Sequence, residues 1–312
     1  MIIGRENQTM NNDFSLLGFQ ILHSLRIPFF LLILILYIFT IMGNVMIFAL
    51  VWSYHNLNHP MFFFLGHLSL CDITLTTTIV PIMLYGILRG TVNISVAACL
   101  AQLQIFCAIV ASECFLLAVM SFDRYLAICN PLQYVYIMRK EICFQLVILC
   151  WTLGSSITFI VTILISKLEF CGPNIIDHFF CDFVPVLQLS CSDNSAVKLG
   201  QLFVATTIAA FSVISIIVTY IYILSTVFKI ESIAGRQKAL STCSSHMTVL
   251  ATFLGSLIGL YILPSSGKTL SANKVISLLY TIVTPLSNPI IYSLRNFEIR
   301  VVLKKIFKKI KL

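Results

Sequence analysis

The chain has 312 residues, of which 59% are hydrophobic and only 10% are charged. A soluble domain usually carries about 25% charged residues, so this composition excludes a protein that covers itself with a polar surface in water. The net charge of +8 does not indicate nucleic-acid binding, because no soluble domain carries it on one face. The length instead leaves room for about seven membrane-spanning helices of ~20–25 residues.

Seven apolar stretches are long enough to cross a bilayer as helices. They are residues 27–51, 61–88, 96–128, 142–165, 199–228, 239–263 and 275–292. Residues 1–24 contain no apolar core of the length of a cleaved signal peptide, so the first span is expected to act as its own insertion signal. Most of the 20 Lys and Arg lie on segments that then face the cytoplasm, and this bias places the amino terminus outside. We therefore expect an all-α membrane protein with one domain over 1–312: an extracellular segment, a seven-helix bundle over 27–294, and a cytoplasmic tail over 295–312.

The expected spans contain ionisable residues, which are costly inside a bilayer and so are functional candidates. Asp72 lies in the second span, Glu113 in the middle of the third, and Asp123 and Arg124 near its end. Glu113 and Arg124 are 11 residues apart, which puts them on one side of a helix and roughly 16 Å apart. Asp72 and Glu113 cannot both be ionised at close range without a cation, so we expect them to share a proton or a cation such as Na⁺.

Small, polar and proline residues interrupt two of the spans. In the first span, Gly43 is expected to permit a close helix contact and Asn44 to hydrogen-bond a neighbouring helix. In the last span, Pro285 and Pro289 are expected to kink the helix and to free backbone carbonyls that need new donors. The side chains placed to help are Ser287 and Asn288.

The longest connection, of about 30 residues between the fourth and fifth spans, is expected to be ordered or functional. Together with the outer end of the third span it places four cysteines on the oxidising side, which are Cys99, Cys171, Cys181 and Cys191. Four cysteines permit three disulfide pairings. A metal site formed by His178 and the three loop cysteines is the alternative, which an extracellular location disfavours.

Both ends of the chain have features expected outside the bilayer. Asn7-Gln8-Thr9 is an acceptor for glycosylation on the outer side, whereas the similar acceptor at Asn93 lies too close to the membrane for us to expect its use. Near the other end, apolar residues recur at helical spacing with lysines between them. These are Ile299, Leu303, Ile306 and Ile310. They predict an amphipathic helix on the anionic inner leaflet, with a calmodulin-type partner as the less favoured alternative.

Several motifs stand in a fixed order along these spans. Asp123-Arg124-Tyr125 ends the third span, and Asn288-Pro289-Ile290-Ile291-Tyr292 lies in the last. Together with seven spans and an outer amino terminus, they make nearly the whole chain resemble a rhodopsin-like G-protein-coupled receptor. Further motifs resemble those of its olfactory branch, of the tetrapod type. They begin at Pro60, Met120, His178, Lys238 and Pro285.

The resemblance implies a function and a set of pairings. It implies a plasma-membrane odorant receptor, not an enzyme, that activates a stimulatory heterotrimeric G protein and raises cyclic AMP. It selects the disulfides Cys99–Cys181 and Cys171–Cys191. It also implies that Asp123 holds Arg124 at rest, and that a cytoplasmic switch moves when ligand binds. The switch residues are Asp123, Arg124, Tyr125, Tyr220, His246, Asn288, Pro289 and Tyr292.

The odorant pocket is expected between the outer halves of the third, fifth, sixth and seventh spans, on the face of the third span that carries Arg124. Its expected lining is Phe106, Cys107, Val110, Ala111, Val204, Ile208, Leu257, Ile258, Tyr261, Leu278 and Thr281. This lining is mostly apolar and favours small, neutral, hydrophobic molecules over peptides. Amine receptors carry a carboxylate where Phe106 stands, and opsins need a lysine in the last span, so both classes are excluded.

Two residues depart from the olfactory pattern: Ser287 stands where Leu is usual, and Leu254 where Tyr is usual. Two other classes of function compete with the receptor. A transporter that uses Asp72 and Glu113 as an ion relay would need an internal repeat or a polar path through both leaflets, and the chain has no visible repeat. An intramembrane enzyme would need a nucleophile and an acid spaced for His246 as base, and none is apparent.

Overall fold

The computed structural model describes residues 13–20, 23–54, 57, 59–171, 173–262 and 270–310. Within them, six helical stretches have the length and composition to cross a membrane. These are Arg26–Ser53, Pro60–Arg89, Val96–Cys129, Lys140–Ser166, Ser195–Phe228 and Asn273–Leu294. A further long helix, α8 (Ile233–Ile262), completes a set of seven. The prediction of a seven-helix bundle is confirmed, and each helix begins and ends near the expected positions.

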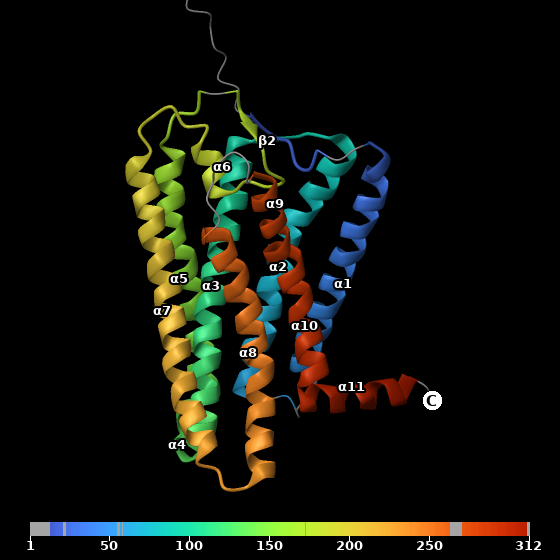
Figure 1. Ribbon diagram of the computed structural model, residues 1–312, viewed down its shortest axis with the longest axis vertical. Helices are drawn as coiled ribbons and strands as arrows, with labels where there is room; N and C mark the ends of the chain where they lie inside the picture. Colours follow the sequence, from blue (N-terminus) through green and yellow to red (C-terminus); the bar gives the residue numbers. More distant parts are fainter. Residues whose placement is uncertain are drawn as a thin grey trace, which may run out of the picture.

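Figure 1 shows these helices side by side as α1, α2, α3, α5, α7, α8 and the pair α9 and α10. Helices α1, α2, α3, α5 and α7 are the first five stretches named above, in that order. Helix α9 is Leu270–Leu278, and α10 is Thr284–Arg295. The central helix α3 packs against α2, α5 and α7. At Gly154 of α5 an added Cβ would lie 2.9 Å from the backbone nitrogen of Ser112 in α3. A small residue therefore lets these two helices approach closely, as in other membrane bundles.

The end of the bundle that carries Arg124, here called the inner end, has two short helices outside the spans. These are α4 (Pro131–Ile137) and α11 (Phe297–Ile310). α11 follows α10 and runs outward from the lower end of that helix, roughly perpendicular to the spans (Figure 1). Ile299 and Val302 are buried, whereas Lys304 and Lys305 are exposed. The predicted amphipathic helix is confirmed, and its lysines are free to face anionic headgroups.

The opposite, outer end carries a small β-sheet that the sequence did not predict. Its strands are β1 (Asp13–Leu16), β2 (Val92–Ser95) and β3 (Ile175–Ile176), in the order β2-β1-β3. β1 pairs antiparallel with β2 and parallel with β3. The alternation of β1 buries Phe14 and Leu16 completely. β1 is therefore packed onto the outer end of the bundle, where the ring of Phe14 lies edge-on against Phe170 of the long loop.

A proline of the last span frees a backbone carbonyl, as expected, but the donor that satisfies this carbonyl is not an expected one. Pro289 has no N–H for the carbonyl of Pro285, and Asn44 of α1 donates its Nδ2 to that oxygen at 2.9 Å. The expected donors bind elsewhere: Ser287 donates to the carbonyl of Thr284, and Asn288 donates to Asp72. Thus the donor comes from a neighbouring helix, because the side chains of Ser287 and Asn288 are already engaged with other acceptors.

The same helix contains a π-helical turn over Leu279–Val283, directly before Pro285. The N–H of Thr284 bonds to the carbonyl of Leu279, five residues back. Pro285 has no N–H with which to continue the α-helical pattern, so a wider turn at this position removes the conflict. The wider turn also rotates the residues before it relative to the α-helical register.

The contact between α1 and α10 predicts the effect of Asn44→Ala. The variant leaves the buried carbonyl of Pro285 without its donor, and we expect a loss of about 1–3 kcal/mol in stability. Thermal unfolding of the receptor in lipid nanodiscs measures this loss. Val45→Ala is the matched control, because Val45 is largely exposed on the outer surface of the same helix. Equal melting temperatures for the two variants would contradict the assigned role of Asn44.

Candidate functional site

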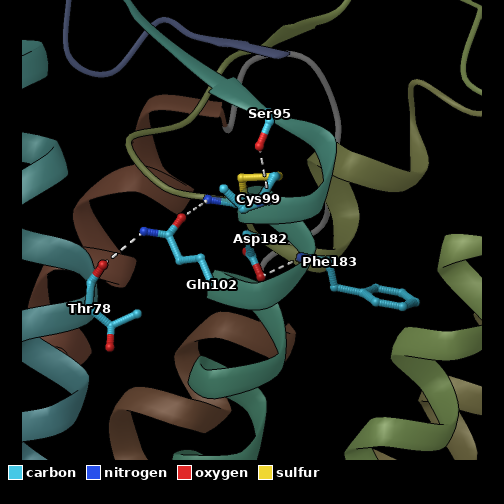
Figure 2. The surroundings of a disulfide bond; sticks show 8 residues. Thr78, Ser95, Cys99, Gln102, Asp182 and Phe183 are labelled. Atoms are coloured by element: carbon cyan, nitrogen blue, oxygen red, sulfur yellow. Dashed lines mark hydrogen bonds between the residues drawn. A yellow bond between two sulfur atoms is a disulfide. The ribbon is translucent and has the colours of Figure 1, made fainter. Parts of the chain in front are cut away.

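The long loop between α5 and α7 is fastened to the outer end of α3. A disulfide joins Cys99, in the first turn of α3, to Cys181, with 5.4 Å between their Cα atoms. Gln102 donates to the carbonyl of Thr78 in α2 and accepts from the N–H of Cys181, both at 2.9 Å (Figure 2). One side chain thus links α2, α3 and the loop beside the disulfide. Since these groups are buried, the loop position is strongly determined.

A second disulfide joins Cys171 to Cys191 within the loop. Both pairings that the resemblance implied are present. The metal alternative is wrong, because the three loop cysteines have no free thiol to offer a metal ion. In the described part of the chain no three His, Cys, Asp or Glu side chains are grouped to hold one.

Below this loop lies a cavity of about 370 Å³, within the usual size of small-molecule sites. Six of the residues expected in the odorant pocket line it. They are Phe106, Cys107, Val110, Ala111, Val204 and Ile208. The four on α3 share a face with Arg124, because α3 keeps a regular helical period over its whole length.

The expectation for the last span is wrong in detail. Leu278 and Thr281 do not line the cavity, whereas Tyr280 does. Thr281 is completely buried and donates to the carbonyl of Ser277 at 2.6 Å. The π-helical turn explains the difference, because it rotates this segment away from the α-helical register on which the expectation relied. The remaining expected residues, Leu257, Ile258 and Tyr261, have side chains outside the described residues, as does Leu254.

The cavity is also more polar than the sequence predicted. Its outer part is lined by side chains of the loop, of α5 and of the outer ends of α7 and α9. They are Thr158, Asp177, His178, Asp182, Gln188, Lys198, Gln201 and Asn273. Asp182 and His178 belong to the motif at Cys181 that sequence reasoning noticed but did not place in the pocket. The disulfide to Cys99 was the available signal, since it ties this motif to the helix that forms the pocket wall.

Burial changes the acidity of two loop residues. It raises the pKa of Asp182 to about 6, although the N–H of Phe183 donates to its Oδ1 at 2.7 Å. Burial, together with the nearby ammonium of Lys274, lowers the pKa of His178 to about 3. His178 is therefore neutral at physiological pH and supplies no positive charge to the pocket. Asp177 has its own partner, an ion pair with Lys274, whose Nζ also donates to the carbonyl of Gly18 at 2.8 Å.

The interior carboxylates lie where the charge argument expected them. Asp72 and Glu113 are both buried and lie within electrostatic range of each other. Asn288 of α10 donates to Oδ2 of Asp72 at 2.9 Å. Among the described residues, Oε1 of Glu113 has no hydrogen-bond partner. The cluster thus links α2, α3 and α10 and keeps one carboxylate oxygen available for a proton or a cation.

At the inner end of α3, Arg124 is held by its neighbour. Its Nε donates to Oδ2 of Asp123 at 2.9 Å, and the two side chains form an ion pair. Tyr134 of α4 donates to the other oxygen of Asp123 at 3.0 Å. The hydroxyl of Tyr125 accepts from Asn130. This arrangement satisfies both charges locally and leaves Arg124 with little exposed surface.

The tyrosines expected to support Arg124 are not bonded to it in this arrangement. The hydroxyl of Tyr220 in α7 lies 2.7 Å from Nδ1 of His246 in α8. Tyr292 is completely buried in α10. Three residues earlier in the same helix, Pro289 packs against α1, where an added Cβ on Gly43 would lie 2.9 Å from its ring. The expected close contact at Gly43 is therefore present.

Comparison with known proteins identifies the family. Residues 33–310 match the family profile described as "Olfactory receptor". The chain is 46% identical to olfactory receptor 5P56 of Mus musculus over 302 residues, which is 96% of this chain and 97% of that protein. It is 40% identical to olfactory receptor 11L1 of Homo sapiens over 304 residues, covering 97% and 94%. Olfactory receptor 6X1 of Homo sapiens is 40% identical over 299 residues, covering 96% of each. The chain therefore belongs to the olfactory receptor family, whose members are odorant-sensing G-protein-coupled receptors and not enzymes.

Proposed function

We propose that this chain binds a small odorant in the cavity beneath the disulfide-anchored loop and activates a stimulatory G protein, which raises cyclic AMP. We further propose that it does so at the plasma membrane with its amino terminus outside. The observation that supports this most directly is that one helix, α3, both lines the cavity with Phe106 and Cys107 and carries Arg124 at its other end. Family membership argues against the transporter and the enzyme considered from the sequence.

The proposed activation is a shift between two arrangements. In the closed one, the charges of Asp123 and Arg124 neutralise each other, and the hydroxyl of Tyr134 orients Asp123 by donating to it. An odorant can favour the active arrangement only by binding it more tightly. We propose that α8 then moves outward at its inner end, that the contact between Tyr220 and His246 breaks, and that Tyr220 and Tyr292 turn toward the released Arg124. The cavity opened in this way accepts a helix of the G protein.

We also propose that Asp72 and Glu113 hold a proton or a Na⁺ ion that stabilises the resting state. The residues fit a small cation, because two buried carboxylates supply negative charge and Oε1 of Glu113 accepts no hydrogen bond from the described residues. Oxygen ligands of this kind suit hard cations. A bound cation would supply positive charge to the cluster, while Asn288 would orient Asp72.

Arg124→Ala tests the proposed switch. The variant removes the side chain that contacts the G protein, so a receptor that reaches the cell surface should lose its odorant-dependent rise in cyclic AMP. Arg139→Ala is the matched control, because Arg139 is largely exposed and makes only a long contact with Glu141. A normal cyclic-AMP response from Arg124→Ala at equal surface levels would refute the proposed mechanism.

Glu113→Gln tests the proposed cation site. If Na⁺ binds between the carboxylates, replacing NaCl by a salt of a bulky organic cation should change the basal cyclic-AMP level of the unmodified receptor. The change should be absent in the variant, because the amide no longer supplies the charge. Equal responses of both receptors to the two salts would favour a shared proton instead.

A further inference from the structure

Asp182 differs from the other charged residues around the odorant cavity, because no positive charge neutralises it among the described residues. Asp177 is paired with Lys274. Lys198 is exposed to solvent, and a hydrogen bond from Ser195, assisted by Lys198, holds the pKa of Asp193 below its usual value. Lys198 thus has an acidic neighbour outside the cavity. Asp182 is only partly exposed and lines the cavity.

The position of Asp182 is set by rigid neighbours. It follows Cys181, whose disulfide and backbone bond to Gln102 fix it to α3, and Figure 2 shows its carboxyl group just below that disulfide. Its Oδ1 accepts from the N–H of Phe183 at the start of α6 (Phe183–Leu187). The described residues donate no hydrogen bond to its Oδ2. Asp182 also lies within electrostatic range of the Cys107 thiol on the cavity wall.

We propose that Asp182 is a cation subsite of the odorant pocket, and that this receptor recognises small amphiphiles whose apolar body fills the cavity and whose protonated amine pairs with this carboxylate. The inference rests on the proposed function, since it takes this cavity as the odorant site. It also explains how an amine can bind although Phe106 stands where amine receptors carry their carboxylate. The acid comes from the loop instead of the helix.

The chemistry of the empty pocket favours such a ligand. Because folding raises the pKa of Asp182 to about 6, the carboxylate that is present at neutral pH destabilises the empty receptor, and this penalty is absent once Asp182 is protonated at low pH. An ammonium group placed beside Oδ2 offsets the penalty through a charge-assisted hydrogen bond. The wall below is apolar at Val110, Ala111 and Val204, so the remainder of the ligand is an uncharged chain or ring.

Cyclic-AMP responses to straight-chain primary amines and to alcohols of the same chain lengths test the subsite in cells expressing the full chain. We expect Asp182→Asn to weaken the response to active amines roughly 10- to 100-fold, as for loss of a hydrogen bond to a charge, and to leave the alcohol responses unchanged. Asp182→Glu should retain the preference for amines. Asp193→Asn is the matched control, because Asp193 is exposed on the same loop, and it should respond like the unmodified receptor.

The pH dependence of the amine response gives an independent test of the subsite. An alkylamine stays protonated well above pH 7, as lysine does, so only the receptor group titrates. As the pH falls through about 6, Asp182 gains a proton and the amine response should decline, while the alcohol response should not. His178, which also lines the cavity, does not reproduce this change, because burial lowers its pKa to about 3. The neighbouring cations have acidic partners of their own: Lys274 pairs with Asp177, and Lys198 lies close to Asp193.

Ligand-induced shifts in melting temperature of the purified receptor separate this inference from the proposed function. If alcohols raise cyclic AMP but no amine raises either cyclic AMP or the melting temperature, the cation subsite is overturned. The proposed function then still stands. Amines that raise the melting temperature through Asp182 without any cyclic-AMP response would support the subsite and contradict the proposed function. A preference for carboxylic acids, lost in Lys198→Gln, would also overturn the subsite.

Discussion

Polar groups inside a bundle surrounded by lipid must find their partners within the bundle, and the arrangement of these helices depends on that constraint. Pro289 frees the carbonyl of Pro285, and Asn44 supplies the missing donor from α1. Asn288, one residue before Pro289, donates to Asp72 of α2. Consecutive turns of α10 are thereby bonded to two different helices. Pro289 interrupts the backbone hydrogen bonding of α10, and the carbonyl that it frees gives this helix a defined contact with α1.

The central helix α3 connects the two ends of the receptor. It begins at a disulfide that holds the loop, lines the cavity with Phe106 and Cys107, passes Glu113, and ends at Arg124. The distance from Glu113 to Arg124 is roughly 16 Å on an ideal helix. Under the proposed function, contact with a ligand need not be transmitted through a series of separate elements. It would bias the packing of α7 and α8 against one rigid helix, whose far end carries Arg124.

Much of the fold could be predicted from the sequence, because long apolar runs have few alternatives in a bilayer. The spans, the amphipathic α11 and the close contact at Gly43 all follow from local composition and period. The three-stranded sheet did not follow, since β1 is stabilised by strands about 80 and 160 residues away in the chain. The π-helical turn before Pro285 was missed as well. Pro285 signals an interruption of the α-helical bonding, but the proline alone does not distinguish a wider turn from a simple kink.

The candidate site, like the fold, could be predicted only in part from the sequence. The residues of α3 that line the cavity were predicted correctly, because Arg124 sets the phase of a regular helix and the period then determines which side chains share a face. The sequence by itself also determined the interior pair Asp72 and Glu113, since charges at such depth have few alternatives. Only the tertiary structure placed Asp182 in the pocket and Tyr280 in the wall in place of Thr281. A loop has no period from which direction can be read, so its side chains are positioned by a disulfide and by Gln102, contacts that exist only once the helices have assembled.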